Sequence, residues 1–311
     1  MTEPAETAPP DVFDARFLAF LETITHLRPK LHRYCARMTG SVLDGEDVAQ
    51  EALFQAYRKL HSFDDRRPMA PWLFRIAHNR CIDFLRRRGV QIEAETAVLA
   101  PDFVPPVNPV GPDLGRAVEH LVMALPPKER ACVLLKDVFD YTLEEIAELV
   151  DSTPGGVKAA LSRGRAKLDA LPKDAAPPRA ASEETSQLLH LYVDRFNRRD
   201  WDGLRELISA DARLQVADRF VGRLSDSPYF GRYDKIANWR MAVGEVDGRL
   251  AIITLRADGD RWTPQSLVRL DIADGRVERV VDFLHCPWVL TNAFSVEVND
   301  RADVSPAAGQ P

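Results

Sequence analysis

The stretch STPGGVKAALSRGRAKL, residues 152–168, decides how the middle of this chain is interpreted. Thr153 followed by Pro154 is a helix-start signal, because the threonine side chain caps free amides and proline has no amide to satisfy. Small or apolar residues then recur at helical spacing and predict one buried face: Val157, Leu161, Gly164 and Leu168. The other faces carry Lys158, Ser162, Arg163, Arg165 and Lys167. The segment therefore predicts a helix that is buried on one side and basic elsewhere.

A second helix is predicted directly before it. TLEE at residues 142–145 forms a capping box, in which Thr142 and Glu145 satisfy each other's backbone amides. One apolar stripe follows: Leu143, Ile146, Ala147 and Val150. Two short helices joined by a tight turn, the second of them basic, predict a helix-turn-helix. The alternative is a helical hairpin whose basic face is merely solvated.

The composition narrows the class of protein. The net charge of −6 argues against a chain that is basic throughout, but positive charge is concentrated at residues 86–88 and 158–167, as local contact with nucleic acid requires. The chain has no apolar run of about 18 residues and no signal peptide, so we expect a cytoplasmic protein.

The cysteines and histidines carry no clear metal signature. The four cysteines stand far apart, which favours reduced thiols over a disulfide framework. His32 with Cys35, and His78 with Cys81, have metal-like spacing, but both pairs fall inside predicted helices. We interpret them as buried residues and predict neither a metal nor a cofactor.

Changes in composition divide the chain into segments. Helical patterns cover residues 12–89 and 114–171, and a proline-rich extended linker separates them at residues 90–113. A second linker covers residues 172–182, and helical periodicity then leads into alternating strands over residues 183–298. Residues 1–11 and 299–311 are predicted to be a disordered leader and a disordered tail.

Three ordered segments resemble extracytoplasmic-function (ECF) sigma factors of the sigma-70 family. DGEDVAQEALFQAYRKL (44–60) resembles region 2.2, PWLFRIAHNRCIDFLRRR (71–88) resembles regions 2.3 to 2.4, and residues 124–168 resemble region 4. The resemblance covers residues 12–171, about half of the chain. It implies two all-α domains, a region 2 helical bundle and a region 4 helix-turn-helix, that bind core RNA polymerase and promoter DNA.

The resemblance also implies roles for individual residues. The helix at 154–168 would read the −35 element through Thr153, Gly155, Gly156, Lys158, Ala159, Ser162, Arg163 and Arg165. The loop at 61–70 and the following helix would hold the opened −10 element through Arg66, Arg67, Arg75, Asn79, Arg80, Arg86 and Arg87. The clamp coiled coil of the polymerase β′ subunit would receive Asp47, Gln50, Glu51, Gln55 and Arg58. The β flap would be a second polymerase contact. Without the resemblance, solvated surface is the simpler interpretation of these charges.

Two pairs of small residues set the −35 helix apart. Gly155 and Gly156 lie in its first turn, where bare backbone and the helix dipole favour a phosphate. Ala159 and Ala160 stand where many relatives carry a serine and an arginine, which leaves only apolar contact with a thymine methyl. A relative's promoter sequence therefore does not transfer to this chain.

Residues 183–298 resemble, more diffusely, the SnoaL-like, NTF2-type cone fold. Helical patterns at 183–199 and 201–209 precede strand-like runs at 212–216, 250–256, 266–272 and 277–284, which predicts an α+β domain. A curved sheet wrapped by helices commonly encloses a pocket, and the titratable candidates for it are Tyr229, Tyr233, Asp282 and His285. Asp282 ending a strand and His285 packing are the alternatives. The sequence carries no nucleophile elbow or phosphate loop, so we predict no enzyme activity.

The combined prediction is an ECF sigma factor whose C-terminal domain modulates its activity. That domain would contact the sigma domains or their linker, or bind a small ligand. Two rivals remain: a ligand-sensing helix-turn-helix regulator that acts without sigma function, and an NTF2-fold enzyme with a DNA-binding appendage. The segments at 44–60 and 71–88 argue against both, because neither rival requires a helix that docks on polymerase or one that melts DNA.

Overall fold

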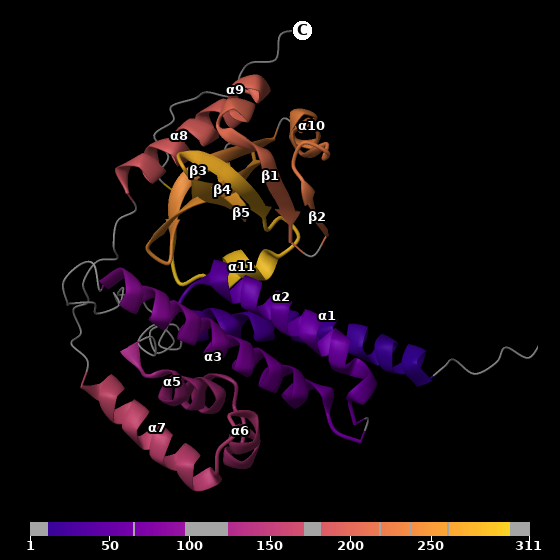
Figure 1. Ribbon diagram of the computed structural model, residues 1–311, viewed down its shortest axis with the longest axis vertical. Coiled ribbons are helices and arrows are strands. Elements are labelled where there is room, and N and C mark those ends of the chain that lie inside the picture. The colour runs from indigo at the N-terminus through magenta and orange to yellow at the C-terminus, as the bar shows by residue number, and fades with distance from the viewer. Residues whose placement is uncertain are drawn as a thin grey trace, which may run out of the picture. The chain divides into compact units, whose positions relative to one another are not determined.

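Figure 1 shows a computed structural model of the chain, which describes residues 12–64, 66–96, 124–170, 182–217, 219–236, 238–259 and 261–298. The chain forms two compact units. The described residues up to 170 belong to the N-terminal unit, and those from 182 onward belong to the C-terminal unit.

Long helices make up the first part of the N-terminal unit: α1 (Val12–Thr39), α2 (Val42–Lys59) and α3 (Met69–Thr96), with the 3₁₀ turn η1 (Leu60–Ser62) between the last two. Ser41 caps α2 by accepting a hydrogen bond from the amide of Asp44 at 3.2 Å. Helix α3 continues to Thr96, so the extended linker predicted from residue 90 is wrong over its first residues. The rest of that linker, the leader, the tail and residues 171–181 lie outside the described residues.

The second part of this unit consists of short elements: α5 (Pro127–Val133), the π-helical turn η3 (Leu134–Val138), α6 (Leu143–Leu149) and α7 (Pro154–Asp169). The capping box before α6 is present, since the Glu145 amide donates to the Thr142 hydroxyl at 3.2 Å and the Glu145 carboxylate accepts from the Thr142 amide at 2.7 Å. Thr153 caps α7 as predicted. Helices α6 and α7 pack together and form the predicted helix-turn-helix.

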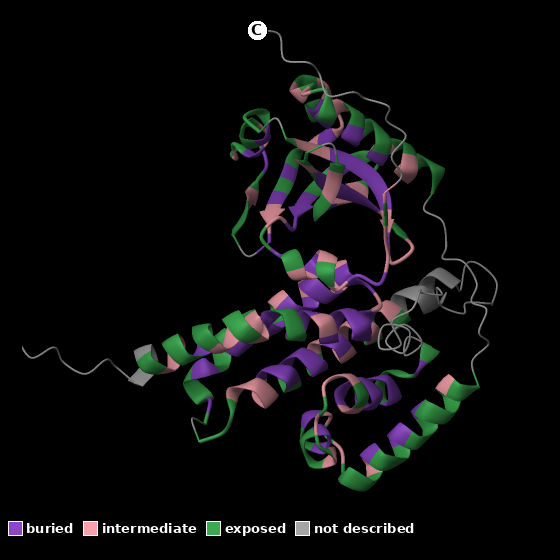
Figure 2. Ribbon diagram, turned by 180° about the vertical axis from the view of Figure 1, so that it is seen from behind, coloured by how far each residue is buried: buried purple, intermediate pink, exposed green. Residues whose placement is uncertain are grey.

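One hydrophobic core runs through both parts of the N-terminal unit, and Figure 2 shows its buried residues along the facing sides of the helices. Aromatic rings join the parts: Phe74 of α3 lies 5.7 Å from Phe139 and 5.6 Å from Tyr141 between ring centroids. The buried guanidinium of Arg130 donates to the Met38 carbonyl at the end of α1 and, at 3.1 Å, to the Leu125 carbonyl. The helix-turn-helix part is therefore packed on the three long helices through shared buried side chains.

Helices and a seven-stranded sheet make up the C-terminal unit, as an α+β domain requires. Its helices are α8 (Glu183–Asn197), α9 (Trp201–Glu206), α10 (Tyr229–Asp234) and α11 (Pro287–Thr291). Its strands are β1 (Ile208–Val216), β2 (Phe220–Arg223), β3 (Trp239–Val246), β4 (Arg249–Asp258), β5 (Arg261–Ala273), β6 (Arg276–Asp282) and β7 (Val296–Val298). Three of the predicted runs lie within strands, and the fourth, 277–284, continues two residues beyond the end of β6, while β2, β3 and β7 were not predicted. The strand order is β2-β1-β6-β5-β4-β3-β7, with β1 and β6 parallel.

Alternation along the strands decides which side chains enter the core. Ala212 and Leu214 of β1 are buried on one face, and Arg213 between them is exposed on the other. Helix α8 packs against β3 and β4 and contributes Tyr192 and Phe196 to the same core. Leu191, whose helical spacing with Leu188, Tyr192 and Phe196 predicts burial, is 40% exposed, because the helix turns Leu189 and Val193 inward instead.

Candidate nucleic-acid interface

Helix α7 presents one continuous surface that is free of the core. Val157, Ala160, Leu161 and Gly164 are buried. Lys158, Ala159 and Ser162 are exposed between them. The prediction that Ala160 faces DNA is wrong, since its side chain is fully enclosed. Only Ala159 of the two alanines lies where a thymine methyl could touch it.

The two glycines of the first turn differ in their surroundings. A Cβ at Gly156 would lie 2.7 Å from the Ser152 hydroxyl, so the absence of a side chain there has a packing reason. A Cβ at Gly155 would meet its nearest neighbour, the Thr153 hydroxyl, at 4.0 Å. Packing therefore does not require a glycine at position 155. The contact of Gly155 with a phosphate stays a prediction.

The cations of α7 fall into two groups. Glu129 of α5, whose side chain is 8% exposed, accepts from Arg163 at 2.9 Å and from Lys167 at 2.8 Å. Arg165 pairs with Asp137, its Nε lying 3.2 Å from Oδ2. Lys158, by contrast, is exposed and has no ion pair with any described residue. Two of the predicted DNA-binding arginines thus also anchor α7 to the elements before it.

The arginines predicted to hold the −10 element are all at the surface, and most of them are paired. Arg66 is held by Asp64 in its own loop, with contacts of 2.9 and 3.1 Å. Arg67 donates to Glu148 of α6 at 2.9 Å, and Arg75 lies 3.9 Å from Asp151 in the turn before α7. Asn79 is exposed nearby. His78 is buried, as expected for a pair inside a helix, and is hydrogen-bonded to the Tyr34 hydroxyl at 2.8 Å.

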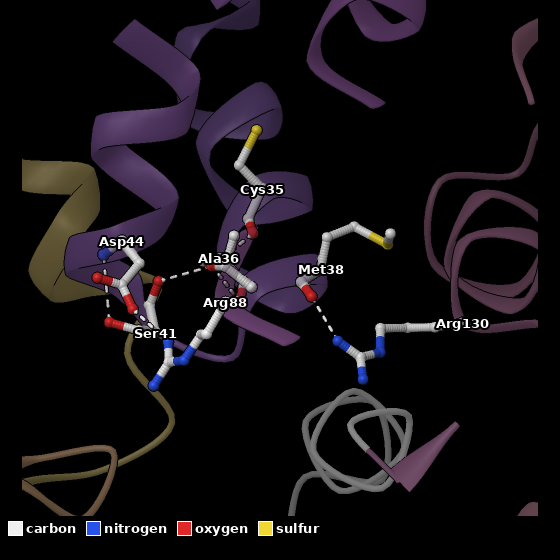
Figure 3. A network of polar contacts seen from close by, with 8 residues as sticks. Cys35, Ala36, Met38, Ser41, Asp44, Arg88 and Arg130 are labelled. Atoms are coloured by element: carbon white, nitrogen blue, oxygen red, sulfur yellow. Dashed lines mark hydrogen bonds and ion pairs between the residues drawn. The ribbon is translucent and has the colours of Figure 1, made fainter. Parts of the chain in front are cut away.

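Three of the four later arginines of α3 contact residues of α2. Arg80 donates to Gln55 at 2.6 Å, and Arg87 lies 3.9 Å from Glu51. Arg88 pairs with Asp44 at 3.0 Å, as Figure 3 shows beside the separate contact of Arg130 with Met38. Arg86 pairs with Asp83 at 3.2 Å within α3. Two predicted DNA-binding arginines, Arg80 and Arg87, therefore contact two predicted polymerase-binding residues, Gln55 and Glu51.

The predicted polymerase-binding residues Asp47, Gln50, Glu51, Gln55 and Arg58 all lie at least partly at the surface of α2. Tyr57, whose helical spacing with Leu53 and Leu60 predicts burial, is 47% exposed, and Phe54 is 65% exposed. Leu18 and Leu21 of α1 are also exposed. These apolar side chains were not among the predicted site residues, because the helical pattern assigned large apolar groups to the core.

The C-terminal unit holds a buried polar cluster on the core face of its sheet. Oδ2 of Asp282 accepts from the hydroxyls of Tyr229 at 2.9 Å and Tyr233 at 2.8 Å. Its Oδ1 accepts from the Leu284 amide at 2.9 Å. Burial raises the pKa of Asp282, and the three hydrogen bonds offset only part of this effect.

Two other residues change the predicted membership of this cluster. His285 is exposed, so the structure does not bring its side chain into the buried group. Tyr192 of α8 is fully buried near Asp282, and its hydroxyl has no hydrogen-bond partner among the described residues. Helical periodicity marked Tyr192 as a core residue, so nothing in the sequence separated its hydroxyl from the surrounding packing.

Neither unit shows a metal site or a membrane span in its described part. No three His, Cys, Asp or Glu side chains gather there in a group that could hold a metal ion. The four cysteines are buried, and none of them forms a disulfide with a described residue. No described helix is long and apolar enough to cross a bilayer.

A helical bundle followed by a helix-turn-helix with a basic second helix defines a DNA-binding transcription factor. The family Sigma-70 region 2 matches residues 23–90, and Sigma-70, region 4 matches residues 115–168. The sequence is 33% identical over 162 residues to the ECF RNA polymerase sigma factor SigW of Bacillus subtilis (strain 168), covering 48% of this chain and 87% of that protein. The chain belongs to the ECF family of RNA polymerase sigma factors, which bind RNA polymerase and promoter DNA.

Similarity extends into the C-terminal unit for some relatives. The ECF sigma factor SigG of Mycobacterium tuberculosis (strain ATCC 25618 / H37Rv) is 29% identical over 301 residues, covering 83% of this chain and 79% of that protein. The crystal structure of M. tuberculosis SigJ is 18% identical and covers 84% of this chain and 95% of that one, with a TM-score of 0.34. The C-terminal unit is consistent with the predicted SnoaL-like fold.

Proposed function

We propose that α7 reads the −35 element through its exposed surface, with Lys158 as the cation most available to a phosphate. The observation that supports this is the division of cations along the helix: Arg163, Arg165 and Lys167 are paired, and Lys158 is not paired with any described residue. Arginine pairs can be exchanged for phosphate pairs, but Lys158 has no internal partner to give up. The protein would act in the cytoplasm, with core polymerase.

The −10 element would be held by the loop before α3 and by the first turns of that helix. Arg67 and Arg75 pair with Glu148 and Asp151, which belong to region 4. Single-stranded promoter DNA would therefore compete with these carboxylates for the same cations. Since both pairs are largely exposed, each contributes little to stability, and exchange for DNA phosphates costs little.

For polymerase, we assign the surface of α2 to the clamp coiled coil of the β′ subunit and region 4 to the flap of the β subunit. Charged and amide side chains alone provide little binding energy at an exposed surface. Phe54 and Tyr57 add apolar area in the middle of the predicted polar set, and aromatic side chains commonly dominate interface energetics.

The C-terminal domain would modulate initiation without catalysing a reaction. The buried cluster of Asp282, Tyr229 and Tyr233, with the unpaired hydroxyl of Tyr192 beside it, supports a small ligand as the input. Contact of this domain with the sigma regions or their linker is the second way in which it would act.

Run-off transcription tests the proposal. Core polymerase with the full chain should initiate on members of a genomic promoter library, and failure on all of them would count against it. Deleting residues 183–311 should change the amount of product at equal folded concentration. Equal product from both proteins would remove the regulatory role of the C-terminal domain.

Promoter binding at different salt concentrations tests the assignment of Lys158. Lys158→Ala should lower the salt slope by about 1, which corresponds to one lost phosphate contact. Lys167→Ala is the matched control, because it removes the same charge from the same helix at a side chain already paired with Glu129. Equal slopes for the two variants would contradict the assignment.

A further inference from the structure

A row of arginines crosses the exposed face of the C-terminal sheet. Arg213 of β1 lies in register with Arg223 of β2 on one side and with Arg279 of β6 on the other. Register partners on neighbouring strands point to the same face, so the three side chains stand together. The face is the one opposite Leu214 and Val280, which are buried in the core.

These side chains are accessible. Arg223 and Arg279 keep 66% and 44% of their side-chain surface exposed, and Arg213 is exposed as well. Strand β2 is an edge of the sheet, so the row begins at an open side of the domain. Neighbouring strands are about 4.8 Å apart, which places the row over a span of about 10 Å.

Nearby acids neutralise only part of the charge. Asp211 lies 3.5 Å from Arg223, and Asp271 pairs with Arg279 and, at 3.1 Å, with Arg269. Arg223 and Arg279 thus each pair with one aspartate, and Arg279 shares its aspartate with Arg269. The side chain of Arg213, in the middle of the row, forms no ion pair or hydrogen bond with a described residue.

Like charges that face each other across strands destabilise a sheet. The row contains two such pairs in succession, Arg223 with Arg213 and Arg213 with Arg279, and the fold gains nothing from the mutual approach of these three arginines. A polyanion would relieve the repulsion. Arginine suits that role, because its guanidinium can bind a phosphate through two parallel hydrogen bonds.

We propose that this arginine row binds the phosphate backbone of promoter DNA upstream of the −35 element. The sigma regions of the same chain bind promoter DNA, so duplex is present at high local concentration whenever the protein acts. The eleven residues from 171 to 181 join α7 to the C-terminal domain, and a chain of that length spans at most about 40 Å. About one turn of duplex, 34–36 Å, lies within this reach.

The test uses holoenzyme made with the full chain, and two templates of a promoter selected by run-off transcription. One template ends just upstream of the −35 element, and the other continues for two further helical turns. Wild-type holoenzyme should bind the longer template more tightly. The variant Arg213→Gln/Arg223→Gln should lose this gain, and its salt slope on the longer template should fall by about 2.

Arg232→Gln is the matched control, since it removes the same kind of charge from an exposed position of α10, outside the row. It should behave as wild type on both templates. The double variant should also be at least as stable as wild type, because the facing like charges are gone. Run-off from the short template by all three proteins shows that sigma activity is intact, so any loss on the long template reports on the row alone.

Two outcomes would overturn the proposal. The first is an equal gain from upstream DNA, with equal salt slopes, in the double variant and the Arg232→Gln control. The second is a loss of affinity for core polymerase in the absence of DNA, which would assign the row to a protein partner.

Discussion

The two units bury titratable groups of opposite character. In the sigma unit these are the imidazoles of His32 and His78, which are 0% and 6% exposed. Burial lowers the pKa of His32 to about 3 and that of His78 to about 4. In the C-terminal unit the buried group is the carboxyl of Asp282, and burial raises its pKa. In both units burial disfavours the charged form, and this lowers the pKa of the histidines and raises the pKa of the aspartate.

The difference makes the units respond oppositely to acid. Below the ordinary histidine pKa of 6.5, His32 and His78 take up protons in the unfolded chain but stay neutral in the folded sigma unit. The sigma unit therefore loses stability as the pH falls. Asp282 holds its proton more tightly in the folded state, so its contribution to stability is lost as the pH rises above 3.8 and through the raised pKa. A fall in pH therefore destabilises the sigma unit through its histidines and stabilises the C-terminal unit through Asp282.

The largest effect is expected in the sigma unit. Lowering the pH from 7.5 to 5 should cost about 2 kcal/mol for each of the two histidines, or about 4 kcal/mol together. Hydrogen exchange measured by mass spectrometry should show this loss in peptides from α1 and α3. His32→Gln keeps a donor for the Val42 carbonyl and should remove about half of the loss. If peptides from both units showed the same loss of protection, the two units would not differ in their response to acid.

A smaller effect is expected at Asp282. Asp282→Ala leaves the Tyr229 and Tyr233 hydroxyls buried without their acceptor and should cost roughly 3 kcal/mol, since each unsatisfied group costs about 1–3 kcal/mol. Asp282→Asn should cost less and should abolish the pH dependence of exchange in β6. If the asparagine variant kept the wild-type pH dependence, another group would have to be responsible for it.

The sequence predicted what local chemistry determines. Thr142, Thr153 and the spacing of apolar residues define α6 and α7, because caps and helical periodicity depend on neighbours in the chain. The tyrosines and Asp282 were also predicted together, from residue type and from the fold that the sequence resembles. Their hydrogen bonds then bring α10 and the end of β6 together.

The failures come from tertiary neighbours. Ala160 and Tyr57 lie at the edges of their helical stripes, where the packing partner decides which side is covered. Strand β3 was missed because its middle is buried on both faces, so its sequence lacks the alternation of a half-exposed strand. The arginine row depends on the register of three strands, two of which are far apart in sequence, and no local pattern reports it.

The smallest effect separates two tyrosines of one cluster. Tyr233→Phe removes a hydrogen bond to Asp282 and should cost about 1–2 kcal/mol, as a bond to a buried acceptor does. Tyr192→Phe removes a buried hydroxyl that no described residue satisfies, so the domain should keep its stability or gain slightly. Urea unfolding of the two variants and the wild type, followed by the fluorescence of the nearby Trp201, measures both. A loss in Tyr192→Phe as large as that in Tyr233→Phe would show that the Tyr192 hydroxyl has a partner in solution. The asymmetry between the two tyrosines would then disappear, along with one of the two observations that support a ligand in this cluster.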